Sequence, residues 1–460
     1  MKTYINNFKH LCTLLLTALA FVACSSDNDD IATPEPVQPA NGDITFTAVF
    51  GVKNATTRAL SDSGNGTLTA SWQRGEQIAI VFGGNKYTAT VTEVDNDGNA
   101  IVSATLPSGT PNNQAVTYIY PASAADGSGL RNDLLATQDG TLATLSSTLD
   151  VASADGNIVI DGTNAQPNGT VTLVNQFAVC KFQFKDENDQ AIEDITSLTI
   201  TDLATTEVIN VTTTSAPSVV YVAMLPSNNS TKFELWDSSD NYYGKTSSAH
   251  LEAGMFYHPT FQINLLGGCT DGYEWVNLGL PSGTKWAKYN IGASSPEGYG
   301  NYYAWGETET KSDYSWVTYK FCENGVYSNM TKYNSNDNLT ELEAEDDAAT
   351  ANWGSSWQMP SKAQYEELCN NSYTTGEWTT QNGVNGYRFT SKSNGISIFL
   401  PAAGFYSGTN LLWAGSQGLY WFRSHAYTFR SIALFFASNT FGLSDANRYN
   451  GYSIRPVLKQ

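Results

Sequence analysis

The sequence predicts a mainly β protein with two β-sandwich domains followed by a third domain of mixed α and β structure. At 460 residues, the chain is longer than one ordinary hydrophobic core allows, so several domains are expected. Aromatic residues make up 12%, with 25 tyrosines and 38 glycines, and Thr, Ser and Val are abundant, which favours half-buried strands. The composition then shifts near residue 270, where tryptophans become frequent.

The charge balance narrows the choice of partners. The formal net charge is −20, and charged residues make up only 15% of the chain. Because a protein that binds nucleic acid needs a basic face for the phosphates, we expect no nucleic-acid partner. Peripheral adhesion to anionic lipid is disfavoured for the same reason. A well-solvated extracellular surface fits the composition better.

Residues 1–23 are predicted to be a signal peptide. Lys2 and Lys9 precede the apolar run "LCTLLLTALAFVA", which is short for a membrane span and ends in small residues before Cys24. The sequence "FVAC" resembles a bacterial lipobox, although Phe21 stands where leucine is commoner. The resemblance implies that Cys24 becomes the lipidated N-terminus of an outer-membrane lipoprotein held by several acyl chains. The alternative is an ordinary signal peptide followed by a chance cysteine.

Residues 24–42 are predicted to be a flexible tether. The segment "SSDNDDIATPEPVQPANG" is polar, acidic and rich in proline, so it cannot bury a core. Asp27, Asp29 and Asp30 resemble the acidic export signal of Bacteroidetes surface lipoproteins, which implies exposure at the cell surface. An ordinary linker would have a similar composition.

Residues 43–140 are predicted to form the first sandwich and residues 141–266 the second. Short strands separated by Asn, Gly, Asp and Ser are typical of such domains. The runs "EQIAIVF" and "KYTATVT" flank "GGN", which predicts a hairpin. In "DITFTAVF" the apolar residues alternate with polar ones and fall on one face of a strand: Ile44, Phe46, Ala48 and Phe50.

Several runs in this part resemble the fimbrillin family of Bacteroidetes pilins and related surface lipoproteins. They are, in order, "TTRAL", "SWQRGEQIAIVF", "VNQFAVCKFQF", "VVYVAMLP" and "LEAGMFYHPTFQI". The resemblance implies two transthyretin-like sandwiches. It also implies that a protease cuts near an N-terminal arginine and opens a groove for a donor strand from another pilin subunit. Arg58 and Arg74 are the candidate processing sites, and the alternative is that each is an exposed loop arginine that is never cut.

Residues 270–460 are predicted to form the third domain. Its runs include "WVNLGLPSGTKWA", "YYAWGE", "DDAATANWGSSWQMPS", "IFLPAAG", "GLYW" and "GYSIRPV". These runs resemble the major paralogous domain named after Fibrobacter succinogenes, and they imply an α+β fold of the C-type-lectin type. Around "ELEAEDDAATANW" the pattern is helical, and Ser361 with Gln364 is placed as the capping box of a second short helix.

The cysteines that follow the lipobox show no zinc spacing. Cys180 shares a strand face with Phe182 and Phe184 in "FAVCKFQF", so we expect a buried thiol. Cys322 and Cys369 are a candidate disulfide in an oxidising compartment, although their spacing does not establish the bond.

The sequence favours no catalytic residue, metal site or cofactor. Formylglycine-generating relatives of the lectin-like fold use a late cysteine pair, and no cysteine follows Cys369. Glu307 and Glu309 are carboxylates of the type that glycosidases use, but beside Lys311 they are expected to be a solvated strand end or turn. His250 and His258 are expected at surface or satisfied core positions. We therefore predict a protein that is not an enzyme.

The stretch from residue 420 to residue 436, "YWFRSHAYTFRSIALFF", is the candidate binding site. Its ends have the apolar pattern of core strands, with Phe422 and Phe435 the residues most expected to be buried. Its middle mixes aromatic and cationic residues, which are typical anchors of binding interfaces. The alternative is plain packing of an aromatic-rich domain. The candidate ligand-binding residues are Trp413, Arg423, His425, Tyr427, Phe429, Arg430 and Phe441.

The types of residue in this stretch also fit a target of a diversity-generating retroelement. Such elements mutate template adenines, and Asn codons then give Phe, Arg, Ser, His, Tyr, Thr, Ile, Leu or Ala. Residues 422–432, Thr440 and Phe441 all belong to that set. A fixed interface with the same anchor residues is the alternative.

Taken together, the resemblances imply a cell-surface lipoprotein adhesin, either at a pilus tip or standing alone. Its C-terminal domain would bind a host or bacterial protein or glycan without covalent chemistry, and its sandwiches would contact other pilin subunits by donor-strand exchange. The competing classes are a carbohydrate-active enzyme and a structural pilin whose last domain is a spacer.

Overall fold

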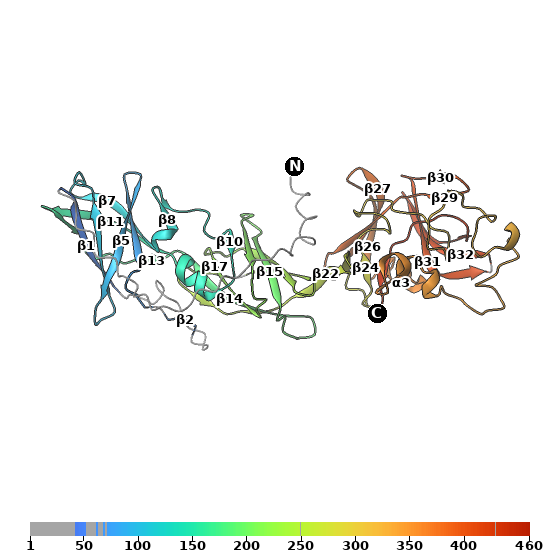
Figure 1. Ribbon diagram of the computed structural model, residues 1–460, viewed down its shortest axis with the longest axis horizontal. Helices are drawn as coiled ribbons and strands as arrows, with labels where there is room; N and C mark the ends of the chain where they lie inside the picture. Colours follow the sequence, from blue (N-terminus) through green and yellow to red (C-terminus); the bar gives the residue numbers. More distant parts are fainter. Residues whose placement is uncertain (1–41, 52–60, 63–67, 70, 249, 428) are drawn as a thin grey trace, which may run out of the picture. The chain divides into compact units, whose positions relative to one another are not determined.

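The computed structural model describes residues 42–51, 61–62, 68–69, 71–248, 250–427 and 429–460, and the predictions for Cys24 and Arg58 lie outside them. The protein is mainly β, as predicted (Figure 1). Two compact units divide the chain. The first holds the described residues up to Ser239 together with Gly244–Ile263, and the second holds Asp240–Tyr243 with Asn264–Gln460.

The first unit begins with an eight-stranded sheet in the order β12-β1-β6-β5-β4-β7-β11-β13. Because β12 pairs with both β1 and β11, the sheet closes on itself around a core that includes Phe46, Ile78, Ile80 and Tyr118. The strands are β1 (Ile44–Phe50), β4 (Gln77–Phe82), β5 (Asn85–Val94), β6 (Ala100–Leu106), β7 (Gln114–Tyr120), β11 (Ala152–Asp161), β12 (Asn164–Pro167) and β13 (Val174–Asn175).

Two local predictions for this sheet are confirmed. Along β1 the buried residues alternate as expected and include Ile44 and Phe50. The predicted hairpin joins β4 to β5 through Gly83 and Gly84, with φ of 59° and 74°. Two successive residues with positive φ define the turn whose twist matches a hairpin, and only glycine adopts that backbone without strain.

The second half of the first unit is built from two further sheets. One has the order β17-β14-β20 with β21 also paired to β14, and the other has the order β10-β16-β15-β18-β19 in this unit. The strands are β10 (Thr137–Gln138), β14 (Ala178–Lys185), β15 (Ile195–Asp202), β16 (Val208–Thr212), β17 (Val219–Met224), β18 (Ser230–Asp237), β19 (Asn241–Ser248), β20 (Phe256–Tyr257) and β21 (Thr260–Gln262).

The two halves of the first unit exchange short segments, and this differs from the predicted division at residues 140 and 141. Strand β10 pairs with β16 of the second half, whereas β11 and β12 return to the first sheet. Leu145 and Leu149, from the helical segment η3 (Leu145–Leu149), pack with residues of both halves in one core. Short alternating strands do not reveal which sheet they join, because the partner strand is not encoded locally.

The second unit contains several small sheets. Strands β22 (Asn264–Thr270), β23 (Tyr273–Asn277), β24 (Lys285–Ala287), β34 (Val457–Leu458) and β25 (Trp357–Gln358) lie side by side in that order. A second sheet joins β26 (Thr374–Gln381), β27 (Val384–Ser391) and β28 (Ser397–Pro401), and a hairpin joins β29 (Phe405–Ser407) to β30 (Asn410–Leu412). The last sheet joins β31 (Gln417–Tyr427), β32 (Arg430–Ala437) and β33 (Thr440–Asn447).

The helices of the second unit are short. Helix α2 (Ala348–Trp353) starts at Asp347, whose carboxylate accepts the backbone N–H groups of Ala349 and Thr350. The predicted helix around it is confirmed only from residue 348 on, since Ala344–Asp346 form one 3-10 turn. Helix α3 (Lys362–Leu368) has the predicted capping box of Ser361 and Gln364. No helix in the described part of the chain has the length and apolar character needed to cross a bilayer.

Two hydrophobic cores lie on opposite faces of β31. Leu419 and Trp421 belong to one core, and Tyr420 and Phe422 belong to the other, as the alternation of a strand requires. The prediction that Phe422 is buried is confirmed, whereas Phe435 is half-buried against the first of these cores.

Cys180, Cys322 and Cys369 are free thiols. Cys180 is buried as predicted, and burial raises its pKa to about 12. The candidate disulfide between Cys322 and Cys369 is not formed. Cys322 packs against the core that contains Trp421, and Cys369 packs against the core that contains Phe422, so each thiol serves as a small apolar side chain.

Candidate functional site

The candidate site is the outer half of the β31–β32 hairpin. From Gln417 to Trp421 the two strands pair in regular antiparallel register. The register then shifts twice, between Trp421 and His425 and again between His425 and Tyr427. A bulge of this kind adds residues to one strand and redirects its side chains. It is the structural reason that the simple alternation of the sequence fails in this segment.

The bulged residues of β31 find their partners in a different segment. The Leu342 N–H donates to the Arg423 carbonyl at 2.9 Å, and the His425 N–H donates to the Thr340 carbonyl at 3.2 Å. The Arg423 N–H donates to the Pro360 carbonyl at 3.0 Å. These bonds satisfy the backbone where β31 leaves β32, and they fix the bulge against the 340–342 segment.

The prediction that Arg423 faces a ligand is not supported by its contacts. Its guanidinium pairs with the Glu341 carboxylate at 2.9 Å and donates to Oε1 of Gln358 at 3.0 Å. The side chain is half-buried and bridges two neighbouring segments. The bulge turns it toward these partners, which the sequence pattern did not indicate.

His425 is also turned inward, contrary to the prediction of an exposed side chain. Its Nε2 lies 2.7 Å from the Leu339 carbonyl, and its ring lies 5.8 Å from the Trp305 ring in an edge-on arrangement. Burial lowers the pKa of His425 below its ordinary value, and nearby Arg448 lowers it further, although the Leu339 carbonyl acts in the opposite direction. The burial of the imidazole therefore favours its neutral form, and its contacts with Leu339 and Trp305 help to support the hairpin.

Tyr427, Phe429 and Arg430, here called the hairpin tip, all keep solvent-exposed surface, as predicted for this part. Tyr427 is 63% exposed and Phe429 is 37% exposed. Arg430 pairs with Asp445 of β33 at 2.7 Å, and both side chains are partly exposed. Tyr427 and Arg430 are cross-strand partners. The structure thus brings three of the candidate residues together.

Arg448 supports the hairpin tip by hydrogen bonding to its backbone. The sequence did not predict this role. Arg448 is fully buried, and its Nη2 donates to the carbonyls of Tyr427 at 2.8 Å and Tyr333 at 3.0 Å. Its guanidinium lies 4.7 Å from the centre of the Trp305 ring, which places a cation over an aromatic face. Burial lowers the pKa of Arg448 from its ordinary value, and the adjacent Tyr319 opposes that shift.

The remaining candidates lie on other elements. Phe441 is half-buried, with its ring 5.3 Å from Tyr387 and 6.2 Å from Phe389, so it extends a core, and its role as a ligand contact stays a prediction. Trp413 is 56% exposed on the loop after β30 and lies 5.4 Å from the Phe405 ring. Arg74, in the first unit, is exposed in the turn before β4.

Several acidic groups of the second unit are engaged in ion pairs. Glu307 is buried, pairs with Lys311 at 2.8 Å and accepts the Lys320 N–H at 2.7 Å, so the prediction of a solvated turn is wrong for this residue. Glu309 is exposed. The described residues also include one cluster of three carboxylates whose oxygens lie close enough together to hold a metal ion: Glu343, Glu345 and Asp346. Lys332 pairs with all three carboxylates at 2.6 to 2.8 Å and already supplies the positive charge.

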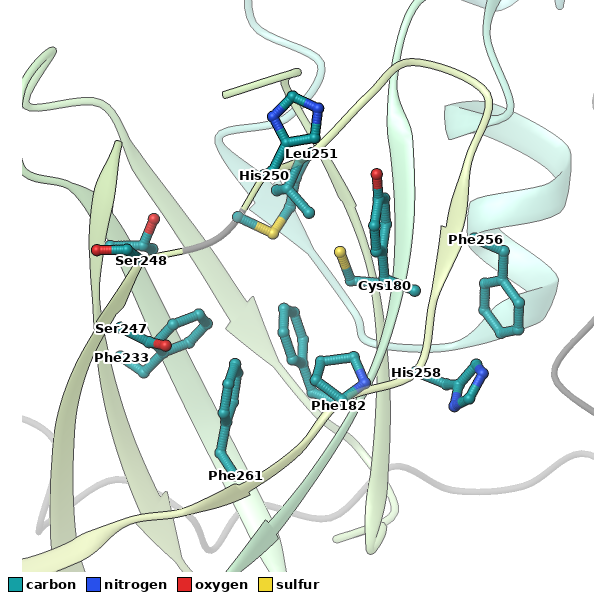
Figure 2. A pocket seen from close by; sticks show the side chains of 14 residues that line it. Cys180, Phe182, Phe233, Ser247, Ser248, His250, Leu251, Phe256, His258 and Phe261 are labelled. Atoms are coloured by element: carbon teal, nitrogen blue, oxygen red, sulfur yellow. The ribbon is translucent and has the colours of Figure 1, made fainter. Parts of the chain in front are cut away.

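The first unit contains an apolar cavity of about 460 Å³ in its second half. Figure 2 shows Cys180, Phe182, Phe233 and Phe261 around this space, and the Phe182 ring packs against Phe233 and Phe261 with ring centres 5.3 and 5.9 Å apart. The imidazole rings of His250 and His258 lie at different points of its border and do not converge. A small-molecule site ordinarily combines an apolar lining with convergent polar groups, and here the labelled polar groups are dispersed.

Neither a known protein family nor a curated protein sequence matches the chain. Among solved structures, a proposed cell adhesion protein from Bacteroides fragilis is 12% identical with a TM-score of 0.30, over 50% of this chain and 95% of that one. A fimbrial protein from Bacteroides ovatus is 11% identical with a TM-score of 0.23, over 91% and 99%. A fimbrial assembly protein from Parabacteroides distasonis is 11% identical with a TM-score of 0.27, over 54% and 94%.

Proposed function

We propose that the protein is a cell-surface adhesin that binds its ligand non-covalently through the second unit. The exposed hairpin tip carries this proposal. Tyr427 and Phe429 expose large apolar area, and Arg430 adds a cationic side chain beside them. Aromatic and arginine side chains on a rigid base are the usual anchors of a binding surface. The buried Arg448 supplies that base through the Tyr427 carbonyl.

The test is a combined glycan and protein array probed with the full chain. Alanine in place of Tyr427, Phe429 and Arg430 together is expected to abolish the signal, because the anchors are removed while the support remains. The matched control is Tyr373→Ala, an exposed tyrosine at the start of a different sheet. A signal that survives the triple substitution would place the ligand elsewhere.

The proposed location is the outer membrane, with the lipid on Cys24 as the anchor and the acidic tether leading to the cell surface. The predicted lipobox and the polar segment that follows it support this location. Metabolic labelling with a palmitate analogue tests the anchor. Loss of label in Cys24→Ala, with the chain released from the membrane fraction, is the expected result.

Pilin subunits are the proposed second class of partner, through donor-strand exchange. The arrangement of β1 supports this. It pairs with β6 at seven successive residues and with β12 on its other side, and Phe46 and Phe50 are buried beneath it. Cleavage at Arg58 or Arg74 would separate β1 from the rest of the chain. Its departure would leave two strand edges and an apolar groove, which a donor strand can fill.

N-terminal sequencing of the protein extracted from the cell surface tests the cleavage. A start at residue 59 or residue 75, after removal of the lipidated segment of the precursor, is the expected result for chains assembled with other subunits. An intact start at Cys24 would leave β1 in place and exclude a donor strand from that groove.

Variation by a retroelement is the proposed origin of the hairpin tip. The exposure of Tyr427 and Phe429 supports it, because exposed positions accept many side chains. The inward-facing His425 and Phe441 count against variation at those two positions. The test is genomic. A reverse transcriptase gene and an imperfect repeat of the 3′ end, differing only at template adenines, are expected near the gene.

A further inference from the structure

The segment between β1 and β4 is tied to the rest of the first unit at its upstream end. Strands β2 (Ser61–Asp62) and β3 (Leu68–Thr69) form a short antiparallel pair. Oδ2 of Asp62 lies 2.6 Å from Nζ of Lys181 and accepts a hydrogen bond from the Tyr221 hydroxyl at 2.6 Å. Lys181 and Tyr221 are cross-strand partners on β14 and β17. The carboxylate therefore joins β2 to a sheet of the second half.

The contact between Asp62 and Lys181 is partly shielded from water. The Asp62 side chain is 9% exposed and the Lys181 side chain is 23% exposed. The hydrogen bond to Asp62 raises the pKa of Lys181 above its ordinary value, so the lysine stays charged. A charge-assisted hydrogen bond with limited access to water holds its partners more firmly than an exposed ion pair does.

The downstream end of the same segment is held in the core of the first sheet. Trp72 is 3% exposed, and its ring centre lies 5.0 Å from that of Tyr120. It belongs to the core that also contains Phe46 and Phe50 of β1. A buried tryptophan removes a large apolar area from water. Trp72 therefore anchors the chain two residues before Arg74.

Arg74 lies in a turn that its neighbours close. The Glu76 carboxylate accepts the Gln73 N–H and the Tyr120 hydroxyl, each at 2.8 Å. The Glu76 N–H donates to the Gln73 carbonyl at 3.3 Å, and the Glu76 carbonyl accepts the Val91 N–H at 2.8 Å, which joins the turn to β5. Arg74 itself is exposed. The backbone on its downstream side is nevertheless fixed by these hydrogen bonds.

This arrangement does not suit cleavage after Arg74. An endoprotease binds several residues on both sides of the bond that it cuts, and it binds them as an extended strand. The chain around Arg74 can take that shape only after the Trp72 ring leaves the core and the turn opens. Cleavage of a folded protein depends on how often such local opening occurs, and a buried, hydrogen-bonded segment opens rarely. An exposed arginine side chain is therefore not sufficient for cleavage.

We infer that processing leaves the bond after Arg74 intact, and that residues 61–62, 68–69 and 71–76, here called the strap, stay with the protein when β1 departs. The inference rests on the proposed donor-strand exchange and adds the limit of the removable segment, which ends before Ser61. Asp62 and Trp72 are the positioning residues. Trp72 stays in the core that β1 leaves, so it forms part of the groove that an incoming strand fills.

The test is digestion of the full chain without denaturant by an arginine-specific endoprotease, with the fragments identified by mass spectrometry. The bond after Arg74 is expected to be cut about 5- to 30-fold faster in Glu76→Ala than in the unaltered chain, because two hydrogen bonds that close the turn are lost. Glu187→Ala is the matched control, since Glu187 is an exposed residue of another turn in the same unit, and the rate should not change.

A second pair of variants tests the tryptophan anchor. Trp72→Ala is expected to give a larger increase in the rate than Glu76→Ala, and Trp72→Phe is expected to restore much of the protection because an aromatic ring still packs against Tyr120. Thermal melting of each variant shows whether it is folded. If Trp72→Ala does not fold, Glu76→Ala and Trp72→Phe still decide the question.

Two results would overturn the inference. One is a cut after Arg74 in the folded chain as fast as in a synthetic peptide of residues 71–80, and the other is an unchanged rate in Glu76→Ala. N-terminal sequencing of the surface-extracted protein separates this inference from donor-strand exchange. A start at residue 75 would retain the exchange and exclude the strap. An intact start at Cys24, combined with slow cutting after Arg74, would exclude the exchange and retain the strap.

Discussion

Two aromatic pairs in this protein have nearly the same geometry and opposite surroundings. In the first unit, Phe182 and Phe233 lie 5.3 Å apart at 66°, buried beside the internal cavity. In the second unit, Tyr327 and Phe429 lie 5.4 Å apart at 68°, in contact with solvent. An edge-on pair is a favourable contact in either place. Its surroundings therefore decide whether it stabilises the fold or remains available to a partner.

The largest difference is expected in stability. Phe233→Ala should lower the free energy of unfolding by about 3–5 kcal/mol, the usual cost of emptying a buried phenylalanine site. Phe429→Ala should lower it by only about 1–2 kcal/mol, because 37% of that residue is already exposed and less buried area is lost. Urea unfolding of both variants measures the two values. Equal losses would mean that the Phe429 ring is part of the core.

Removal of the Arg448 guanidinium, which supports the hairpin tip, is expected to cause the next largest loss of stability. Arg448→Met keeps the volume but leaves the carbonyls of Tyr427 and Tyr333 without their donor, at a cost of about 3 kcal/mol. Arg131→Met is the matched control, since Arg131 is exposed, pairs with Asp133 and donates to the Ser123 carbonyl, and its loss should cost less than about 1 kcal/mol. Amide hydrogen exchange at residues 425–430 should accelerate in the first variant only.

The stability of the protein is expected to depend on pH through His425, the inward-facing residue of the hairpin. Burial lowers the pKa of His425 in the folded state, so the unfolded chain takes up its proton first, near pH 6.5. Stability is therefore full above that pH and falls as the pH drops below it. Arg448 opposes the proton and Asp337 favours it. Melting temperatures at pH 7.5 and pH 5.5 should differ less in His425→Gln than in the unaltered chain, and His258→Gln, in the other unit, is the control.

The smallest effect is expected in the coupling of the exposed pair. A double-mutant cycle of Tyr327→Ala and Phe429→Ala should give a coupling energy of about 0.5 kcal/mol, at the low end for aromatic pairs. The same cycle for Phe182 and Phe233 should give a larger value, because the shared cavity couples the two sites. A coupling of several kcal/mol between Tyr327 and Phe429 would show that the segment of Tyr327 and the hairpin tip support each other's folding.

The sequence could predict the strands whose two faces differ. The alternation in β1, the glycine turn between β4 and β5, and the capping box of α3 all depend on near neighbours in the chain. The burial of Phe422 followed from the same alternation. Where a strand continues regularly, a residue's face follows from counting by two.

The site could be predicted only in part, because its decisive features are not local. The bulge in β31 breaks the count by two, so Arg423 and His425 face inward although the pattern placed them outside. Tyr327 lies about a hundred residues before Phe429, and no pattern joins them. Arg448 follows β33, and its sequence context gives no sign that it would be buried beneath the hairpin tip.

The contacts of Arg448 affect which substitutions the hairpin tip can accept during evolution. Its guanidinium donates to the backbone carbonyl of Tyr427, and its backbone N–H donates to the carbonyl of Phe429 at 3.4 Å. Every amino acid carries that oxygen. A lineage can therefore exchange the side chains at these two positions, one mutation at a time, and keep the loop in place. Recognition can change here without rebuilding the scaffold.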